Sequence, residues 1–540
     1  MRGDDTAAID GTGVEWETAD REGPNETLLS CQCQSPLQYN IALASDRDNR
    51  LAPTTISALE TKSGSTRALA PDLLRGLLAI IMLFGHTATV LHTWAHGTGR
   101  TLEADGHVVK EWAFNTAYVV RTLTHLCASG FTFLLGMGVV YLGQSRRKLG
   151  WKSTQLVRYY ALRCIVLTAV TVVLGLVTSA GQLWFMNAVL FSLAVDYLLT
   201  GLLWLAIDKG AALSMHFFLR ARRGRDAAEV DETISRDSNE EHLTQPLLQQ
   251  RKMTRPADCA SYGTCMSWNI HNMLLLILSV VAIFWNIWLS DNDGMCELSI
   301  TTTTATSPTN PIIRVWFWVI IDVDSHVVSG YPPLAWLSFA ILGMLYGRLV
   351  TARPWTRKTS VFAHSFSAIF FSFLFVLTRI FEFGNLSTGC LQTPEQDANP
   401  SQNPYLISPQ SFFYVVKYPP DVAYWTLTMA ANLALLAVFD AIPPSITGRF
   451  TILLDFGTSA LFFYVAHLLL LFGAAPVLIV IFGQKTGIPE PMDPNKTKGT
   501  DSLPVYFGVS ALMTLVLWPI CRWYSTFKSK KRTDSLWRFF

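Results

Sequence analysis

An acid, an arginine and a histidine follow one another at helical spacing within a single apolar stretch of the chain. Asp72, Arg75 and His86 lie in the run from Ala68 to about Leu91, which is long enough to cross a bilayer. An α-helix brings His86 to within roughly 20° of the face that carries Arg75, about 16 Å further along the axis, with Asp72 one turn below. Ionisable side chains within a span usually face a bundle interior, so this stripe is the first candidate for a functional site.

An imidazole in such a stripe could act as a general base, because its pKa lies near neutrality and it can take a proton from an attacking hydroxyl or amine. His125 and His467 are expected at a similar depth, about 13 Å and about 8 Å from the outer ends of their spans, so a site shared with His86 is geometrically feasible. The alternative is that each histidine bonds across helices in a polar membrane-protein core. His96, just beyond the first span, is a further candidate.

Six basic residues are expected near the cytosolic ends of the first spans, and two of them lie inside spans rather than in loops. The six are Arg75, Arg146, Arg147, Lys148, Arg158 and Arg163. Arg75 and Arg163 are therefore candidates for binding the phosphates of a nucleotide-bearing donor. Other basic residues, such as Arg146 and Arg147, are explained by the positive charge typical of cytosolic loops. The sequence contains no glycine-rich phosphate loop, serine nucleophile elbow or paired-carboxylate signature, and no metal site is predicted.

The composition places these residues in a membrane protein. Half of the 540 residues are hydrophobic and 15% are charged, which is too apolar for an ordinary soluble enzyme. The net charge of +2 comes from basic residues scattered among loops, so no nucleic-acid partner is expected. The expected partners are the lipid bilayer and a small-molecule or glycan acceptor, and a homodimer stays open.

Apolar runs long enough to cross a membrane recur along the chain. They predict an all-α polytopic bundle of about ten transmembrane helices. The stretch 473–483, which is broken by Gly473 and Pro476, leaves an eleventh crossing open. The ten runs are Ala68–Leu91, Thr116–Gly143, Tyr159–Thr178, Leu183–Ile207, Ile270–Ser290, Pro333–Val350, Ser360–Phe381, Asp421–Ile442, Phe450–Phe472 and Pro504–Trp523.

The basic residues that flank these runs predict that both termini are cytosolic, in an endomembrane (vacuolar, lysosomal or endoplasmic reticulum) or in the plasma membrane. The predicted organisation is a disordered cytosolic tail at 1–66, transmembrane helices 1–4 at 67–207, a disordered cytosolic loop at 208–268, transmembrane helices 5–10 at 269–526 and a basic cytosolic tail at 527–540.

The outer side is expected to carry two kinds of covalent modification. The sequons at Asn385 and Asn495 both fall in outer loops, where N-glycosylation could reach them. Cys296 and Cys390 lie in consecutive outer loops, where an oxidising compartment could pair them in a disulfide.

Five blocks of sequence, in order, resemble the heparan-alpha-glucosaminide N-acetyltransferase catalytic domain family. They are RALAPDLLRGLLAIIMLFGHT, RTLTHLCASGFTFLLGMG, YPPLAWLSFAILGMLYGR, KYPPDVAYWTLTM and LFFYVAHLLLL, between Arg67 and roughly Leu471. The spacing of Arg75 and His86 is also similar to that of the wider transmembrane acyltransferase superfamily, in which Arg and His on the first span are needed for acyl transfer.

The resemblance implies a polytopic enzyme that moves an acyl group, typically acetyl, from cytosolic acyl-CoA to a sugar amine or hydroxyl on the other side. His86 would be the base, and a covalent acyl-histidine stays open. Bacterial relatives carry Asp before the histidine, where this chain has Gly85. The lysosomal relative has Asn in place of His86 and its active histidine in the following loop, where His96 is the nearest match, so both stay candidates.

Two other functions fit the same sequence. A secondary transporter also has many spans with ionisable residues inside them, although no repeat relates the two halves of this chain. A non-catalytic membrane scaffold or sensor is the third interpretation, because the acid and the base that flank the histidine in bacterial relatives are missing.

Overall fold

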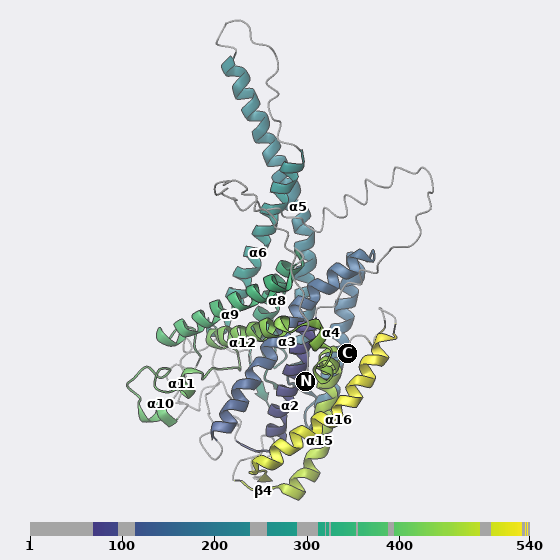
Figure 1. Ribbon diagram of the computed structural model, residues 1–540, viewed down its shortest axis with the longest axis vertical. Helices are drawn as coiled ribbons and strands as arrows, with labels where there is room; N and C mark the ends of the chain where they lie inside the picture. Colours follow the sequence, from purple (N-terminus) through teal and green to yellow (C-terminus); the bar gives the residue numbers. More distant parts are fainter. Residues whose placement is uncertain are drawn as a thin grey trace, which may run out of the picture.

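The computed structural model describes residues 69–94, 114–237, 256–288, 311–318, 320–322, 326–352, 355–386, 394–486, 498–531, 535 and 537, and every structural statement below concerns these residues. Ten of the helices described are long and apolar enough to cross a membrane, which confirms the predicted all-α polytopic bundle (Figure 1). The architecture is that of an integral multi-pass membrane protein.

The long helices carry most of the chain. They are α2 (Leu69–Val90), α3 (Phe114–Lys148), α4 (Ser153–Thr178), α5 (Leu190–Asp237), α6 (Pro256–Trp288), α8 (Pro333–Ala352), α9 (Arg357–Ile380), α12 (Val422–Ala441), α15 (Ala460–Phe482) and α16 (Leu503–Ser529). Short helices connect them: α7 (Pro311–Arg314), α10 (Pro394–Ala398), α11 (Pro409–Phe412), α13 (Pro444–Thr447) and α14 (Thr451–Thr458). The strands are β1 (Phe185–Asn187), β2 (Ile320–Asp322), β3 (Val327–Ser329), β4 (Gln484–Lys485) and β5 (Lys498–Gly499).

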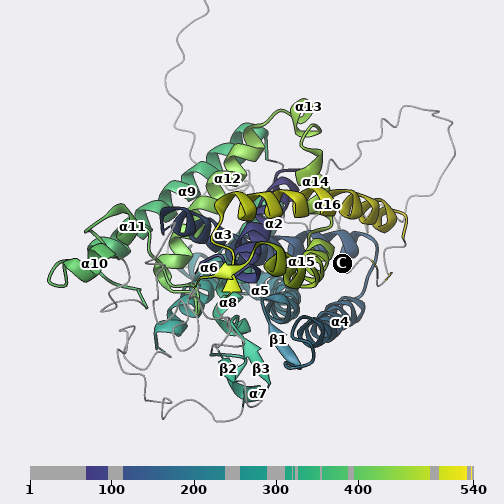
Figure 2. The same ribbon diagram turned by 90° about the horizontal axis from the view of Figure 1, so that it is seen from below.

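Helix α2 lies in the middle of the bundle, where it packs against α3, α12, α14, α15 and α16 (Figure 2). Glycines permit the closest of these approaches. A side chain at Gly76 would overlap the backbone of Leu453 on α14, and one at Gly457 would overlap the carbonyl of Asp72. The helix that carries the predicted stripe is therefore enclosed by protein rather than placed at the lipid surface.

The fourth span begins later than predicted, because the start of its apolar run forms a strand. Strand β1 pairs in parallel with β3, which pairs antiparallel with β2. The side-chain amide of Asn187 donates through Nδ2 to the hydroxyl of Ser329 at 3.0 Å and to the backbone carbonyl of Tyr331 at 2.6 Å. These bonds hold β1 against the segment that precedes α8, and α5 begins only after them.

The predicted loop at 208–268 contains long helical extensions. Helix α5 continues to Asp237 and α6 begins at Pro256, and Figure 1 shows α5 projecting beyond the rest of the bundle. The polar composition that predicts disorder also suits a helix that leaves the membrane and enters water.

The stretch 473–483 is the second half of the ninth span. Helix α15 runs from Ala460 to Phe482 through Pro476, and the helical break lies at Ser459, between α14 and α15. Because one helix holds the whole run from Ala460, this stretch adds no eleventh crossing within the described part of the chain.

Candidate functional site

Two of the predicted histidines meet between α2 and α15. Nδ1 of His86 lies 2.7 Å from Nε2 of His467, and the two rings are nearly parallel, with centroids 5.0 Å apart. The side chain of His467 is completely buried, and that of His86 is partly buried. The sequence placed the two residues at a similar depth, and the packing of α15 on α2 brings them into contact.

The surroundings of His467 fix which nitrogen of each ring carries a proton. Nδ1 of His467 lies 2.9 Å from the carbonyl oxygen of Phe463, which can only accept a hydrogen bond. In the neutral ring Nδ1 is therefore the donor, and Nε2 is left to accept from Nδ1 of His86. His86 then carries its remaining lone pair on Nε2, which is the atom that a general base uses.

Aromatic rings of α15 hold His467 in this orientation. The ring of Phe463 stacks on it with centroids 5.3 Å apart, and that of Tyr464 meets it edge-on at 5.6 Å. The hydroxyl of Tyr464 donates to the carbonyl of Ala188 at 2.6 Å, which ties this turn of α15 to the segment before α5. The histidine pair thus rests on packed helices rather than on a loop.

Arg75 lies near the start of α2, about three turns before His86, and forms an ion pair with Asp72. Nη1 donates to the carboxylate of Asp72 at 2.8 Å, and Nη2 lies 3.4 Å from the carbonyl of Leu134 on α3. Asp72 is buried and Arg75 is partly exposed. This geometry gives Arg75 a clear role in joining α2 to α3, while its predicted role in binding a donor stays a prediction.

His125 lies against a different helix from the histidine pair. Its ring meets that of Tyr424 on α12 edge-on, with centroids 5.4 Å apart, and the Tyr424 hydroxyl donates to the His125 carbonyl at 2.5 Å. Helix α3 also touches α2 at this level, because a side chain at Gly85 would overlap Thr124. The structure therefore joins His86 to His467 and places His125 beside α12.

Basic side chains gather at the end of the bundle where α3 ends. Nη2 of Arg147 bonds to Asp208 on α5 at 3.1 Å, and Nε of Arg348 bonds to Asn272 on α6 at 3.0 Å. The guanidinium of Arg163 lies over the ring of Tyr197, 4.3 Å from its centroid. These contacts link α3, α4, α5, α6 and α8 at the end of the bundle that we call the basic end.

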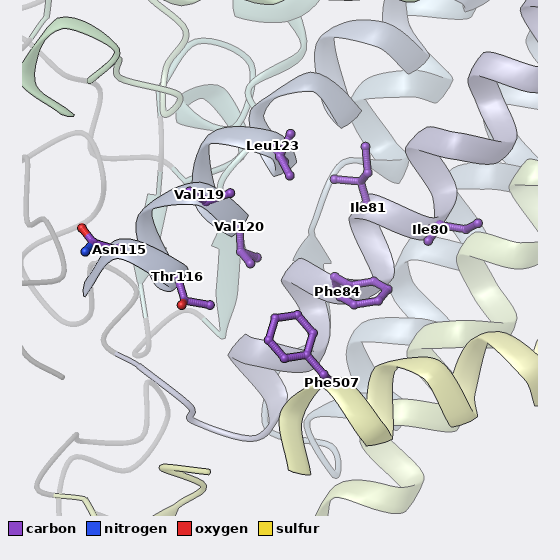
Figure 3. A pocket seen from close by; sticks show the side chains of 9 residues that line it. All are labelled: Ile80, Ile81, Phe84, Asn115, Thr116, Val119, Val120, Leu123 and Phe507. Atoms are coloured by element: carbon purple, nitrogen blue, oxygen red, sulfur yellow. The ribbon is translucent and has the colours of Figure 1, made fainter. Parts of the chain in front are cut away.

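A groove lies on the opposite side of α2 from the histidine pair. It has a volume of about 510 Å³ and is lined by residues of α2, α3 and α16 (Figure 3). Phe84 lines it, and Phe84 is two residues, or about 200° of helix, away from His86. The groove is therefore not part of the histidine site. Its lining consists of Ile80, Ile81, Phe84, Asn115, Thr116, Val119, Val120, Leu123 and Phe507.

Several predicted residues lie apart from this site or outside the described residues. The side chain of Asn385 is buried, and its amide nitrogen donates to the carbonyls of Thr378 and Phe383, each at 3.2 Å. A glycan on that nitrogen would have to displace both bonds, so the folded state disfavours this acceptor. The residues outside the described part of the chain are those of the predicted tail at 1–66 together with His96, Cys296, Cys390 and Asn495.

The structure also reveals buried charged groups that the sequence analysis did not single out. Asp196 on α5, Arg379 on α9 and Asp421 before α12 have no exposed surface. All three lie inside or at the end of an apolar run, and an ionisable residue in such a run is the signal that could have identified them.

Comparison with known proteins gives no relative: the chain matches no protein-family model and no curated protein sequence.

Proposed function

We propose that this protein is a membrane-embedded acyltransferase that moves an acyl group, typically acetyl, from acyl-CoA to an amine or hydroxyl of a sugar-like acceptor. The observation that carries the proposal is the histidine pair, in which the lone pair of His86 is directed to Nε2 by a buried partner. The five sequence blocks described above favour the same class of enzyme.

In the proposed reaction, Nε2 of His86 takes the proton from the acceptor as its nitrogen or oxygen attacks the thioester carbonyl. The carbon–sulfur bond then breaks, and the imidazolium of His86 returns the proton to the departing thiolate. His467 accepts the hydrogen bond from Nδ1 of His86 throughout, which keeps the ring oriented and stabilises its positive charge.

The acyl donor would approach from the basic end, and the excess of positive charge there favours a cytosolic location for it. Arg163 and Arg147 could contact its phosphates there, since a guanidinium group can form two parallel hydrogen bonds to a phosphate. Arg75 would act mainly through its ion pair with Asp72, by fixing the position of α2.

Labelled acetyl-CoA and purified protein in nanodiscs test the proposal directly. We expect acceptor-dependent release of CoA and a covalently acetylated product with at least one member of a panel of amino sugars and glycans. A protein that neither binds acetyl-CoA nor acetylates any acceptor in the panel would contradict the proposal.

A secondary transporter is the second candidate, and Asp196 favours it. Neither carboxyl oxygen of this fully buried residue has a hydrogen-bond partner in the described part of the chain. Unpaired carboxyl groups within the membrane often lie on proton pathways. Uptake of labelled acceptor into proteoliposomes without chemical change, and without acetyl-CoA, would identify a transporter.

A further inference from the structure

Arg379, in the last turn of α9, is completely buried. Within the residues that the structure describes, none of its three guanidinium nitrogens has a hydrogen-bond partner. The rings of Tyr405 and Phe375 lie 4.4 Å and 4.9 Å from the guanidinium carbon. Aromatic rings over a planar guanidinium attract its positive charge through cation–π interactions. The N–H bonds, however, point outward in the plane of the group and still require hydrogen-bond acceptors.

This positive charge cannot be removed by loss of a proton. A buried carboxyl group can become neutral by taking up a proton, but a guanidinium stays charged at any ordinary pH. Burying a charge without a hydrogen-bonded partner is strongly unfavourable. Arg379 therefore needs an anionic partner, and a ligand can supply one.

The carboxylate of Asp421 lies near Arg379, but both of its oxygens accept hydrogen bonds from backbone N–H groups. Oδ1 accepts from the backbone N–H of Tyr424 at 2.6 Å, and Oδ2 accepts from that of Leu386 at 3.1 Å. Asp421 thus caps the start of α12 and fixes the chain after α9. No salt bridge joins it to Arg379 in the part of the chain that the structure covers, so its charge acts on Arg379 only at a distance.

The remaining charges near Arg379 indicate the charge of the ligand. Arg379, Arg121 and Glu395 all act electrostatically on Tyr118, and Arg121 is buried with its guanidinium 4.9 Å from the ring centroid of Tyr414. Two cations therefore lie near two carboxyl groups, those of Asp421 and Glu395, and their formal charges cancel. A ligand with one negative charge disturbs this balance less than a dianion such as phosphate, which the two carboxylates would repel more strongly.

We propose that Arg379 anchors a binding site for the carboxylate of a small organic acid, at the end of the bundle where α9 ends. The edge of the guanidinium would bind both carboxylate oxygens, while its faces contact the rings of Tyr405 and Phe375. The ring of Tyr405 covers the guanidinium, and the nearby side-chain amide of Asn403 donates to the backbone carbonyl of Arg379 at 3.1 Å. This cover belongs to the segment that contains α10 and α11, which lies beside α9 in both views (Figures 1 and 2). Entry of the acid requires that this segment move aside.

The site does not depend on acyl transfer. It lies on α9, α3 and the segment before α12, whereas the histidine pair joins α2 to α15. Binding of a carboxylate can therefore be measured whether or not the protein transfers acyl groups, and the two proposals can fail separately.

Thermal unfolding of the full chain in detergent tests the site. Acetate and benzoate are titrated at constant ionic strength, with acetamide and benzamide as neutral matches and with sulfate and phosphate as dianions. The variants are Arg379→Met, Arg379→Lys and a control, Arg357→Met, which makes a similar change to an exposed arginine at the other end of α9.

We expect a saturable rise in melting temperature with at least one carboxylate, in the wild type and in Arg357→Met, and no such rise with its amide. Arg379→Lys keeps the positive charge but lacks the planar guanidinium that can bind both carboxylate oxygens. The apparent affinity of this variant for the carboxylate should therefore fall by about tenfold or more. Arg379→Met should melt no lower than the wild type without ligand, because it removes an unpaired charge, and should show no response to carboxylate. No saturable rise in the wild type, a response that persists in Arg379→Met, or a ligand-free Arg379→Met that melts well below the wild type would each overturn the assignment.

Discussion

His86 donates to His467 across the boundary between α2 and α15, and the acceptor nitrogen of His467 is set by the Phe463 carbonyl. Gly85, the residue directly before His86, has no side chain that could orient the imidazole. The orienting group in this protein instead comes from a helix almost 400 residues further along the chain, since His86 and His467 are 381 positions apart. A buried imidazole is therefore the partner of the proposed base.

Replacing His467 by Phe should slow acyl transfer without weakening donor binding. The ring of His86 would lose its acceptor, so kcat should fall by about tenfold to a hundredfold, as for other groups that orient a functional histidine. Steady-state release of CoA measures this effect. His326→Phe, at an exposed histidine in another part of the chain, is the control and should retain wild-type turnover. Equal rates for the two variants would show that the pair does not serve catalysis.

Two glycines on α3 provide a matched test of the packing of α3 on α8. A methyl group at Gly136 would overlap the carbonyl oxygen of Ala340, whereas one at Gly138 would meet no atom within 4 Å. We expect Gly136→Ala to lower the free energy of unfolding by about 1 to 3 kcal/mol, as overpacking does. Gly138→Ala should leave it unchanged or raise it by about 0.5 to 1 kcal/mol, because alanine favours a helix. Thermal unfolding in detergent distinguishes the two, and similar melting temperatures would contradict the described contact.

We expect the free energy of unfolding to depend on pH because the carboxyl group of Asp421 is buried. Burial raises the pKa of its carboxyl from the usual 3.8 to about 6, although Arg379 opposes the shift. Between these two pH values the folded state holds a proton that the unfolded state has lost, so this group's stabilising effect is complete below about pH 4 and is lost as the pH rises through 6. A shift of this size corresponds to about 3 kcal/mol.

The variant Asp421→Asn isolates this contribution, because it cannot titrate. The difference in melting temperature between wild type and Asp421→Asn should fall as the pH rises from 4 to 6.5 and should then stay constant. A difference that is independent of pH, or that grows as the pH rises, would show that the carboxyl is not protonated in the folded state.

Variants of the ion pair between Asp72 and Arg75 distinguish a structural role of Arg75 from a role in binding the acyl donor. Asp72→Asn leaves the charge of Arg75 unpaired and should cost about 1 to 3 kcal/mol, less than for a fully buried pair because Arg75 is partly exposed. The double variant with Arg75→Gln should recover most of that loss. Arg75→Gln alone should change KM for acetyl-CoA little. A large rise in that KM would instead assign Arg75 to the donor site.

The sequence predicted the span count because length and hydropathy decide whether a helix can cross a membrane. It placed the start of the fourth span too early, since an apolar run does not distinguish the strand at Phe185–Asn187 from the helix that follows. The stretch after Phe472 was ambiguous for a related reason. Pro476 weakens a helix in isolation, yet α15 continues through it.

The sequence located the histidine site only in part. Helical spacing placed Arg75 and His86 on one face of α2, but no periodicity reveals which residue of a distant helix meets that face. His467 could be identified as a candidate from its depth, while its contact with His86 follows from the packing of α15 on α2. Arg379 shows the same limit, because an arginine at the end of a span resembles an ordinary interfacial residue until its burial is known.

Acceptor-dependent release of CoA by His86→Gln, compared with His125→Gln, tests the central claim most directly. If Nε2 of His86 is the base, kcat of His86→Gln should fall by about a hundredfold or more, because a glutamine cannot take up the proton. His125→Gln, whose ring lies against Tyr424 on α12, should keep more than a tenth of wild-type turnover. Full activity in His86→Gln with loss of activity in His125→Gln would contradict the account and move the base to α3.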